Sequence, residues 1–255
     1  MKVEIVTRGV ETSANAGSSN GRAKHKICAK LVEKLGGGYS STLGIDVASA
    51  QSEEIFKWFL ASLLFSDSIN EGIAIKTYRE CEKKGLLSPQ AILEMGLEGL
   101  VTIFDQGDYG SYTFIVATRI LEAAEGLKDK YEGDINRLHF SAADETDLEN
   151  RLRKLAKGIG TTMVDMFLRE MRDIWEKTEP PLLESAMLAA RKLRLIQTTD
   201  VEAGLEQLKA MLETDELRQC RFSDLEVALI RLGKNYCRKK QCSPCPVKTE
   251  CQNPK

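Results

Sequence analysis

Four clustered cysteines constrain this chain more than any other feature. Seven cysteines occur in the 255 residues, and four of them lie within fifteen residues near the C-terminus: Cys237, Cys242, Cys245 and Cys251. Thiolate is a soft ligand, and four thiolates on a tight loop can hold a tetrahedral zinc ion or a cubane iron-sulfur cluster. Disulfides explain such a cluster poorly in a reducing compartment. The sequence therefore predicts a metal-binding loop.

The spacing of these cysteines favours iron and sulfur over zinc. Zinc sites usually combine two CxxC-like pairs that a longer insert separates. Here only Cys242 and Cys245 form such a pair, and the outer two cysteines flank it at short range. A larger object that touches four sulfurs of one compact loop fits this spacing better, so we expect a [4Fe-4S] cluster. A zinc ion and unligated thiols are the alternatives.

The rest of the chain has helical periodicity. Apolar residues recur at helical spacing from Ser52 onward, as at Ile55, Trp58 and Phe59, and the alternation typical of strands is nearly absent. We therefore expect an all-α fold. Later helices are predicted at residues 112–127, 147–156, 161–175, 182–193, 200–212 and 223–236, with helix N-caps at Ser88, Thr146, Thr199 and Ser223.

Charge and hydropathy narrow the class of protein. The 36 basic and 38 acidic residues nearly cancel, but residues 1–50 carry seven basic against four acidic side chains, and residues 215–255 carry nine against five. Both ends are thus basic, although a basic end is more often a solvated surface than a phosphate-binding face. No apolar run approaches the roughly 20 residues of a membrane helix, and the first residues lack the apolar segment of a secretory signal. We expect a cytoplasmic protein that does not enter a membrane.

A glycine-containing turn lies between two of the predicted helices. Glycines permit a tight hairpin, and bare N–H groups at the start of the next helix can receive a phosphate. Many helix-helix turns contain glycine, so the turn alone is weak evidence for a phosphate-binding site. The cysteine loop that follows it in the same all-α chain makes this interpretation much stronger. The segment consists of Leu155, Ala156, Lys157, Gly158, Ile159, Gly160, Thr161 and Thr162.

With hairpin and cysteine loop in this order, the chain resembles the endonuclease III-like branch of the helix-hairpin-helix DNA glycosylases, from about Glu53 to Cys251. The resemblance is carried by IFKWFLASLLFSDS, SPQAILEMGLEGLVTIF, GDYGSYTFIVATRIL, KGIGTT, and LGKNYC with the cysteine loop. It implies two helical lobes, a helical barrel with the hairpin and an iron-sulfur cluster lobe. Double-stranded DNA would lie between them with a damaged or mispaired base flipped out.

The residue pattern and the resemblance together predict a domain order. Residues 1–50 would form a basic N-terminal arm, mobile over residues 13–26, and a helix at 25–35 that packs on the cluster lobe. Residues 51–178 would form the helical barrel with the hairpin at 155–162, and residues 179–255 the C-terminal helices and the cluster loop. Pro180 and Pro181 make residues 178–181 the best linker candidate.

The chain departs from the family pattern at the catalytic positions. The lysine of bifunctional members, which attacks the sugar, is replaced by Thr162, and no imine can form there. The aspartate after the following helix is missing, so that Glu184 is the nearest carboxylate and Glu179 the second, while Asp165 lies elsewhere on the helix.

Two further departures lie outside the catalytic positions. Relatives often place a glutamine where this chain has Asp67. The first two cysteines are separated by four residues, whereas six are usual in the family.

We therefore predict a monomeric DNA repair protein of the base-excision type, without lysine-dependent lyase activity, that associates with the nucleoid when bound to DNA. Glu184 would be the catalytic carboxylate and Thr162 a neutral pocket residue. A non-catalytic or structure-specific DNA-binding protein on the same scaffold is the second hypothesis, and a zinc-stapled interaction protein unrelated to DNA is the third. The DNA-binding residues would be Lys157, Gly158, Gly160, Thr161, Lys239 and Lys240.

Overall fold

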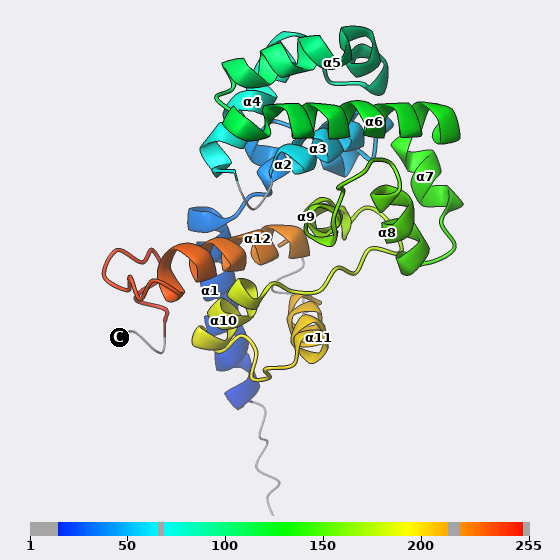
Figure 1. Ribbon diagram of the computed structural model, residues 1–255. Helices are drawn as coiled ribbons and strands as arrows, with labels where there is room; N and C mark the ends of the chain where they lie inside the picture. Colours follow the sequence, from blue (N-terminus) through cyan, green and yellow to red (C-terminus); the bar gives the residue numbers. More distant parts are fainter. Residues whose placement is uncertain (1–14, 66–68, 214–219, 252–255) are drawn as a thin grey trace, which may run out of the picture. The chain divides into compact units, whose positions relative to one another are not determined.

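The protein is helical throughout the part that the structure describes. The computed structural model describes residues 15–65, 69–213 and 220–251, and no strand occurs among them (Figure 1). The predicted all-α class is confirmed. None of the helices in these ranges combines the length and apolar character that a membrane crossing requires. Asp67 and the first fourteen residues of the predicted arm lie outside the described residues.

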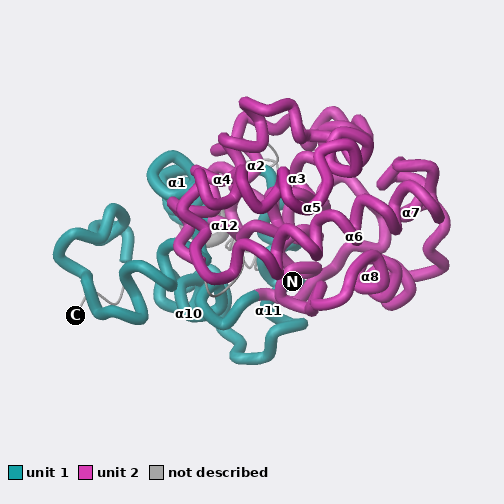
Figure 2. The backbone as a smooth tube through the Cα atoms, turned by 45° about the horizontal axis from the view of Figure 1, so that its top comes forward, with its two compact units in different colours: residues 1–36, 183–221, 228–255 teal, residues 37–182, 222–227 magenta. Residues whose placement is uncertain are grey.

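The chain divides into two compact units (Figure 2). Unit 1 contains residues 1–36, 183–221 and 228–255, and unit 2 contains residues 37–182 and 222–227. The domain boundaries that we drew from the sequence, at residues 50 and 178, stay a prediction.

Unit 2 is built around one helix that is apolar on all sides. Helix α3 (Ser52–Leu64) buries nine of its residues, from Ile55 to Leu64 with only Lys57 left out. A helix that is apolar all round must be covered on every face, and α3 contacts four other helices of unit 2. The Trp58 indole donates a hydrogen bond to the Phe167 carbonyl at 3.0 Å, which fixes α3 against the hairpin helix α9 (Thr161–Met171).

The other elements of unit 2 enclose this core. Tyr39, Leu43, Ile45 and Val47 come from the segment before α3 and lie in the same core. The remaining elements are α2 (Tyr39–Thr42), η1 (Val47–Ser49), α4 (Glu71–Lys83), α5 (Pro89–Gln106), η2 (Gly110–Tyr112), α6 (Thr113–Tyr131), α7 (Ile135–Ser141), α8 (Glu145–Arg153) and the first half of α12 (Phe222–Leu232). Helix α5 is interrupted at Gly96, whose positive φ of 67° suits glycine.

Unit 1 consists of the N-terminal helix and the C-terminal helices. Its elements are α1 (Asn15–Leu35), α10 (Glu184–Lys192), α11 (Val201–Leu212), the second half of α12 and the π-helical turn η3 (Gly233–Cys237). The Arg231 guanidinium donates to the carbonyls of Leu35 and Gly36 at 3.0 and 3.1 Å, and so ties α12 to the end of α1. The helix predicted at 25–35 is present, but α1 begins at Asn15, so residues 15–26 do not form the irregular arm that we expected.

Helix starts differ from the sequence prediction in instructive ways. Ser88 caps α5 as predicted, because its hydroxyl accepts from Ala91 N at 3.2 Å. The caps expected at Thr146 and Thr199 are wrong, since Asp144 caps α8 and Asp200 caps α11, each accepting from the N–H three residues later at 2.8 Å. Aspartate and threonine are both good caps, and the local pattern does not separate neighbouring candidates.

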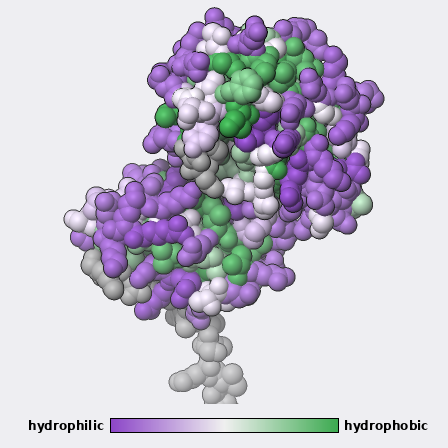
Figure 3. Space-filling view, viewed as in Figure 1, coloured by the Kyte–Doolittle hydropathy of each residue, from purple (hydrophilic) through white to green (hydrophobic). Residues whose placement is uncertain are grey.

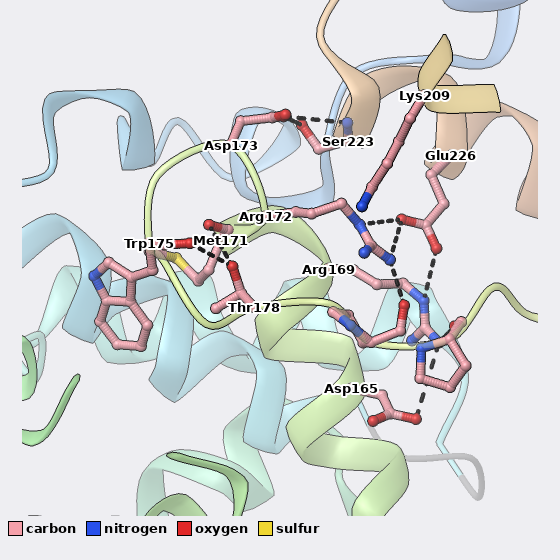
Figure 4. A network of polar contacts seen from close by, with 12 residues as sticks. Asp165, Arg169, Met171, Arg172, Asp173, Trp175, Thr178, Lys209, Ser223 and Glu226 are labelled. Carbon is pink, nitrogen blue, oxygen red and sulfur yellow. Dashed lines mark hydrogen bonds and ion pairs between the residues drawn. The ribbon is translucent and has the colours of Figure 1, made fainter. Parts of the chain in front are cut away.

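Ser223 does not cap α12, because tertiary partners occupy the residues of the predicted capping box. Ser223 donates to the Asp173 carboxylate at 2.7 Å, and the buried Glu226 pairs with Arg169 at 3.2 Å and with Arg172 at 3.4 Å (Figure 4). These pairs join the first half of α12 to the end of α9 and to the residues that follow it, inside unit 2. A buried carboxylate of this kind needs both partners, because a charge that is left unpaired in the interior is strongly destabilising.

Candidate functional site

The cysteine loop of unit 1 follows directly from α12. The helix continues into the π-turn η3, which ends at Cys237, and the chain then turns through residues 238–251 without further regular structure. Gly233 allows the end of α12 to lie very close to α10, since a Cβ at that position would be 2.0 Å from the Ser185 carbonyl oxygen of α10. Only glycine permits so close an approach of the two helices, and that approach brings α10 to one side of the loop.

All four cysteines line one pocket. Its volume is about 290 Å³, and its other lining residues include the apolar Leu188, Leu193 and Val247 and the basic Lys192 and Lys240. A water molecule in the liquid occupies about 30 Å³, so the pocket can hold a group considerably larger than one ion. The Cys251 thiol approaches the Lys192 carbonyl oxygen at 3.9 Å, which places the last cysteine against the end of α10.

The four thiols lie close enough to influence one another. Burial raises the pKa of the Cys237 thiol to about 11, and the negative charge that Cys245, Cys251 and Cys242 would carry as thiolates adds to the rise. Burial also raises the pKa of Cys245. Four mutually repelling thiolates need a cation or a cationic cluster between them. In the described ranges no three His, Cys, Asp or Glu side chains are arranged to hold a single metal ion.

The basic side chains of the loop face solvent. Lys239 and Lys240, both predicted DNA contacts, are exposed, and so is Lys248. Arg238 pairs with the carboxylate of Glu184 at 2.6 Å. The predicted metal and phosphate-contacting residues of this region thus lie together in unit 1.

The hairpin of unit 2 is held by a small apolar anchor. Leu155, Ala156 and Ile159 are buried, whereas Lys157, Gly158 and Gly160 between and after them are exposed. Gly158 has a φ of +86°, a backbone conformation that side chains with a Cβ rarely adopt. The Lys157 N–H donates to the Glu122 carboxylate of α6 at 3.0 Å. The turn is therefore fixed from α6 as well as by its own apolar residues.

The start of α9 leaves N–H donors open. Gly160 occupies the N-cap position, where no side chain accepts a hydrogen bond, and the first turn contains no acidic residue. Thr161 and Thr162 are exposed, and a Cβ placed on Gly160 would meet nothing within 4 Å. Uncapped N–H groups, the positive end of the helix dipole and open space together make a favourable position for an anion.

The predicted catalytic carboxylate lies in an unexpected environment. Glu184 begins α10 in unit 1, its side chain is 90% exposed, and its charge is paired with Arg238. Glu179, the second candidate, is also exposed. Thr162, by contrast, belongs to unit 2. Neither glutamate occupies the desolvated environment in which a carboxylate stabilises charge most strongly.

The hairpin helix α9 carries another candidate for the catalytic carboxylate, Asp165. Asp165 lies three residues after Thr162, and residues at this spacing share a helix face. Its side chain is 14% exposed, and it pairs with Arg169 at 4.0 Å. Burial raises the pKa of Asp165 although the charges of Arg169 and Arg172 lower it. On the facing helix α8, burial raises the pKa of Glu149 and the negative charge of Asp165 adds to that rise.

The sequence pattern predicts no catalytic role for Asp165 or Glu149. The one signal in the sequence is the spacing of three between Thr162 and Asp165. Burial of both carboxylates depends on the packing of α8 against α9, which no local pattern reports.

The comparisons with known proteins agree with this fold. No protein-family model and no curated protein matches the chain. A solved structure described as a non-covalent Endonuclease III-DNA complex matches with a TM-score of 0.55 at 16% identity, over 92% of this chain and 94% of that one. A trapped Endonuclease III-DNA covalent intermediate matches over 78% and 83% with a TM-score of 0.48 at 18% identity. At 16% identity, the match to the non-covalent Endonuclease III-DNA complex establishes an endonuclease III-like fold and nothing further.

Proposed function

We propose that this protein binds duplex DNA and excises a damaged or mispaired base by cleaving its N-glycosidic bond. The observation that carries the proposal is the exposed, uncapped start of α9 behind the glycine turn, because it offers phosphate-binding donors in a fixed geometry. The endonuclease III-like fold supports this assignment, since a DNA complex is among the structures with the same arrangement of helices. Lys157, Gly158, Gly160 and Thr161 would contact the DNA backbone from unit 2.

Unit 1 would supply a second set of phosphate contacts, with a [4Fe-4S] cluster that fixes the loop. A pocket lined by four thiols fits such a group, and Cys237, Cys242, Cys245 and Cys251 would hold it. When bound, the cluster would compensate the charge of the thiolates and restrain the loop. Lys239 and Lys240 would then be presented to phosphates as point charges without any redox step.

The chemistry follows from the side chains near the hairpin. Cleavage breaks the bond between the sugar carbon and the base nitrogen, and water supplies the oxygen that replaces the base. Positive charge develops on the sugar, so that a desolvated carboxylate stabilises the transition state. Glu184 is the carboxylate that the sequence proposes, and Asp165 is the one that burial favours. Thr162 has no amine, so that the reaction would end with an abasic site and an intact strand.

Excision assays test the proposal. The holoprotein is incubated with duplexes that carry uracil, oxidised purines, oxidised pyrimidines, alkylated bases or mismatches, and free base and alkali-labile abasic sites are measured. We expect release of at least one base class, and no strand cleavage without alkali. Borohydride should trap no covalent complex. A trapped adduct that maps to Lys157 would contradict the monofunctional assignment.

A non-catalytic DNA-binding protein is the second candidate. It is favoured by one observation, namely that Thr162 replaces the amine while Glu184 is engaged with Arg238. Tight binding to duplex or damaged DNA, without excision of any base in the panel, would select it. A protein that contains one zinc ion and no iron, and that fails to bind DNA, would instead support the third hypothesis.

A further inference from the structure

Arg119 of α6 forms neither an ion pair nor a strong hydrogen bond among the described residues. Its Nε is buried without a hydrogen-bond partner, and its Nη1 has only a weak contact of 3.6 Å with the Met163 sulfur. Burial lowers the pKa of the guanidinium, whereas the electrostatic influence of Tyr109 and Glu122 raises it. The Glu122 carboxylate accepts the Lys157 N–H and forms no hydrogen bond with the guanidinium. A buried guanidinium nitrogen without a hydrogen-bond partner is unusual, because native proteins satisfy nearly all such groups.

Most other arginines of unit 2 form the ion pair that Arg119 lacks among the described residues. Arg79, Arg137 and Arg151 pair with carboxylates at the surface, and Arg169 and Arg172 pair with Glu226 in the interior. Arg153 also has no ion pair in the described part of the chain, but its side chain is exposed, whereas Arg119 is partly buried. Its missing partner is best sought outside the chain.

The guanidinium lies against the hairpin turn. A Cβ on Gly158 would be 3.1 Å from Nη2 and 3.3 Å from Nε of Arg119, and Met163, in the first turn of α9, is the neighbour of Nη1. The side chain thus reaches from the glycine of the turn to the start of α9. This is the segment whose N–H groups are uncapped.

A phosphate fits this position better than a base edge. A neutral base acceptor would complete the hydrogen bonds of Arg119 but would leave its positive charge uncompensated, whereas a phosphate provides both. The open N–H groups of α9 favour the same chemistry, so that one anion could be shared between the helix start and the guanidinium.

We propose that Arg119 binds a phosphate of the nucleic acid strand held by the hairpin. This inference rests on the proposed function, because it assigns a further contact to the same DNA-binding surface. The guanidinium of Arg119, which lies beside Gly158, donates its N–H groups to the phosphate oxygens. The phosphate completes the hydrogen bonds and the close ion pair that the guanidinium lacks in the free protein.

The test uses Arg119→Met in the full-length holoprotein, with Arg137→Met as the matched control. Both variants lose one positive charge from unit 2, but Arg137 is half exposed and pairs with Glu132.

DNA affinity is measured at several salt concentrations, and thermal stability is measured alongside. For Arg119→Met we expect at least about tenfold weaker binding and a salt slope that is shallower by about 0.9, as for the loss of one phosphate contact. Its melting temperature should stay the same or rise, because a partly buried guanidinium with an unsatisfied Nε is removed. Arg137→Met should bind like the unmodified protein.

Duplexes with a single neutral methylphosphonate, placed at successive positions, distinguish a phosphate from a base. One position should weaken binding by the unmodified protein and have no further effect on Arg119→Met. If instead removal of a base, and no neutral phosphate, abolishes the difference between the two proteins, the phosphate assignment is wrong. Arg119→Gln retains polar donors without the charge, and it should reproduce the shallower slope if the methionine variant does not fold.

A purely structural role predicts the opposite pattern. Arg119→Met and Arg119→Gln would then lower the melting temperature while affinity and salt slope stay unchanged, and the inference would be overturned with the proposed function intact. If the unmodified holoprotein binds no duplex, the proposed function fails and this inference fails with it.

Discussion

The hairpin of unit 2 and the cysteine loop of unit 1 offer positive groups at the surface, but they are held in different ways. The hairpin has its own anchor in Leu155, Ala156 and Ile159, which are buried, and a carboxylate of α6 holds its turn. Within residues 234–251, in contrast, Val247 is the single buried residue. The hairpin can therefore keep its shape by packing alone, whereas the loop depends on what its four thiols bind.

The two regions also differ in the kind of positive group that each offers at its surface. Hydrophilic side chains cover most of the face in Figure 3, with apolar patches between them. At the loop the positive groups are exposed lysines, which act as charges. At the hairpin they are backbone N–H groups and a partly buried arginine, which bind an anion through hydrogen bonds of fixed direction. We expect the loop to contribute affinity that salt weakens and the hairpin to contribute registration on the DNA.

The largest expected effect comes from removing a ligand of the loop. Cys245→Ser should prevent cluster assembly and destabilise unit 1 by more than about 4 kcal/mol, as expected when a bound metal group is lost. Cys220→Ser is the control, because Cys220 lies outside the pocket. Iron content, visible absorbance and thermal unfolding are measured. Normal iron content and normal stability in Cys245→Ser would show that Cys245 is not a ligand and that the loop does not depend on it.

The next prediction concerns the two carboxylates, one in each unit. Asp165→Asn should slow excision by about 100- to 1000-fold, the range found when one preorganised electrostatic group is removed. Glu184→Gln should leave the rate within about threefold, because an exposed and paired carboxylate stabilises charge weakly. Single-turnover rates and DNA affinity are compared for both. The reverse ranking would return the catalytic role to Glu184 and to unit 1.

A third prediction compares the two phosphate-binding surfaces. Gly160→Asp should weaken DNA binding by about 10- to 100-fold, since it places a negative charge at the uncapped start of α9. Gly160→Ala is its control, because the position is open and its φ of −93° is ordinary. The double change of Lys239 and Lys240 to Glu should also weaken binding and should have the stronger effect at low salt. Unchanged binding in Gly160→Asp would show that the hairpin does not face the DNA.

The smallest expected effect tests how the hairpin is held. Gly158→Ala should destabilise unit 2 by about 1 kcal/mol, because the residue has a φ of +86° and the new Cβ would press on Arg119. Chemical denaturation measures the change, and iron content should be unaffected. Loss of iron in this variant would mean that hairpin and loop do not fold independently.

The helices were largely predictable, but of the four predicted caps the structure confirms Ser88 alone. Apolar periodicity located α3, α6, α9 and α11 because it is a property of each segment. Asp144 and Asp200 could not be preferred over their threonine neighbours, since the choice depends on which side chain reaches the helix start in the folded chain. Ser223 and Glu226 had the pattern of a capping box, but Asp173 and Arg169 engage them instead.

The sequence by itself determined the helical class, the turn at Gly158 and Gly160, and the grouping of the four cysteines, because each is encoded within a short stretch of chain. Only the tertiary structure decided the electrostatics of the site. The exposure of Glu184, the burial of Asp165 and the unsatisfied Nε of Arg119 are set by residues distant in the sequence. Desolvation and ion pairing depend on distances in space, and these arise only when the helices have packed.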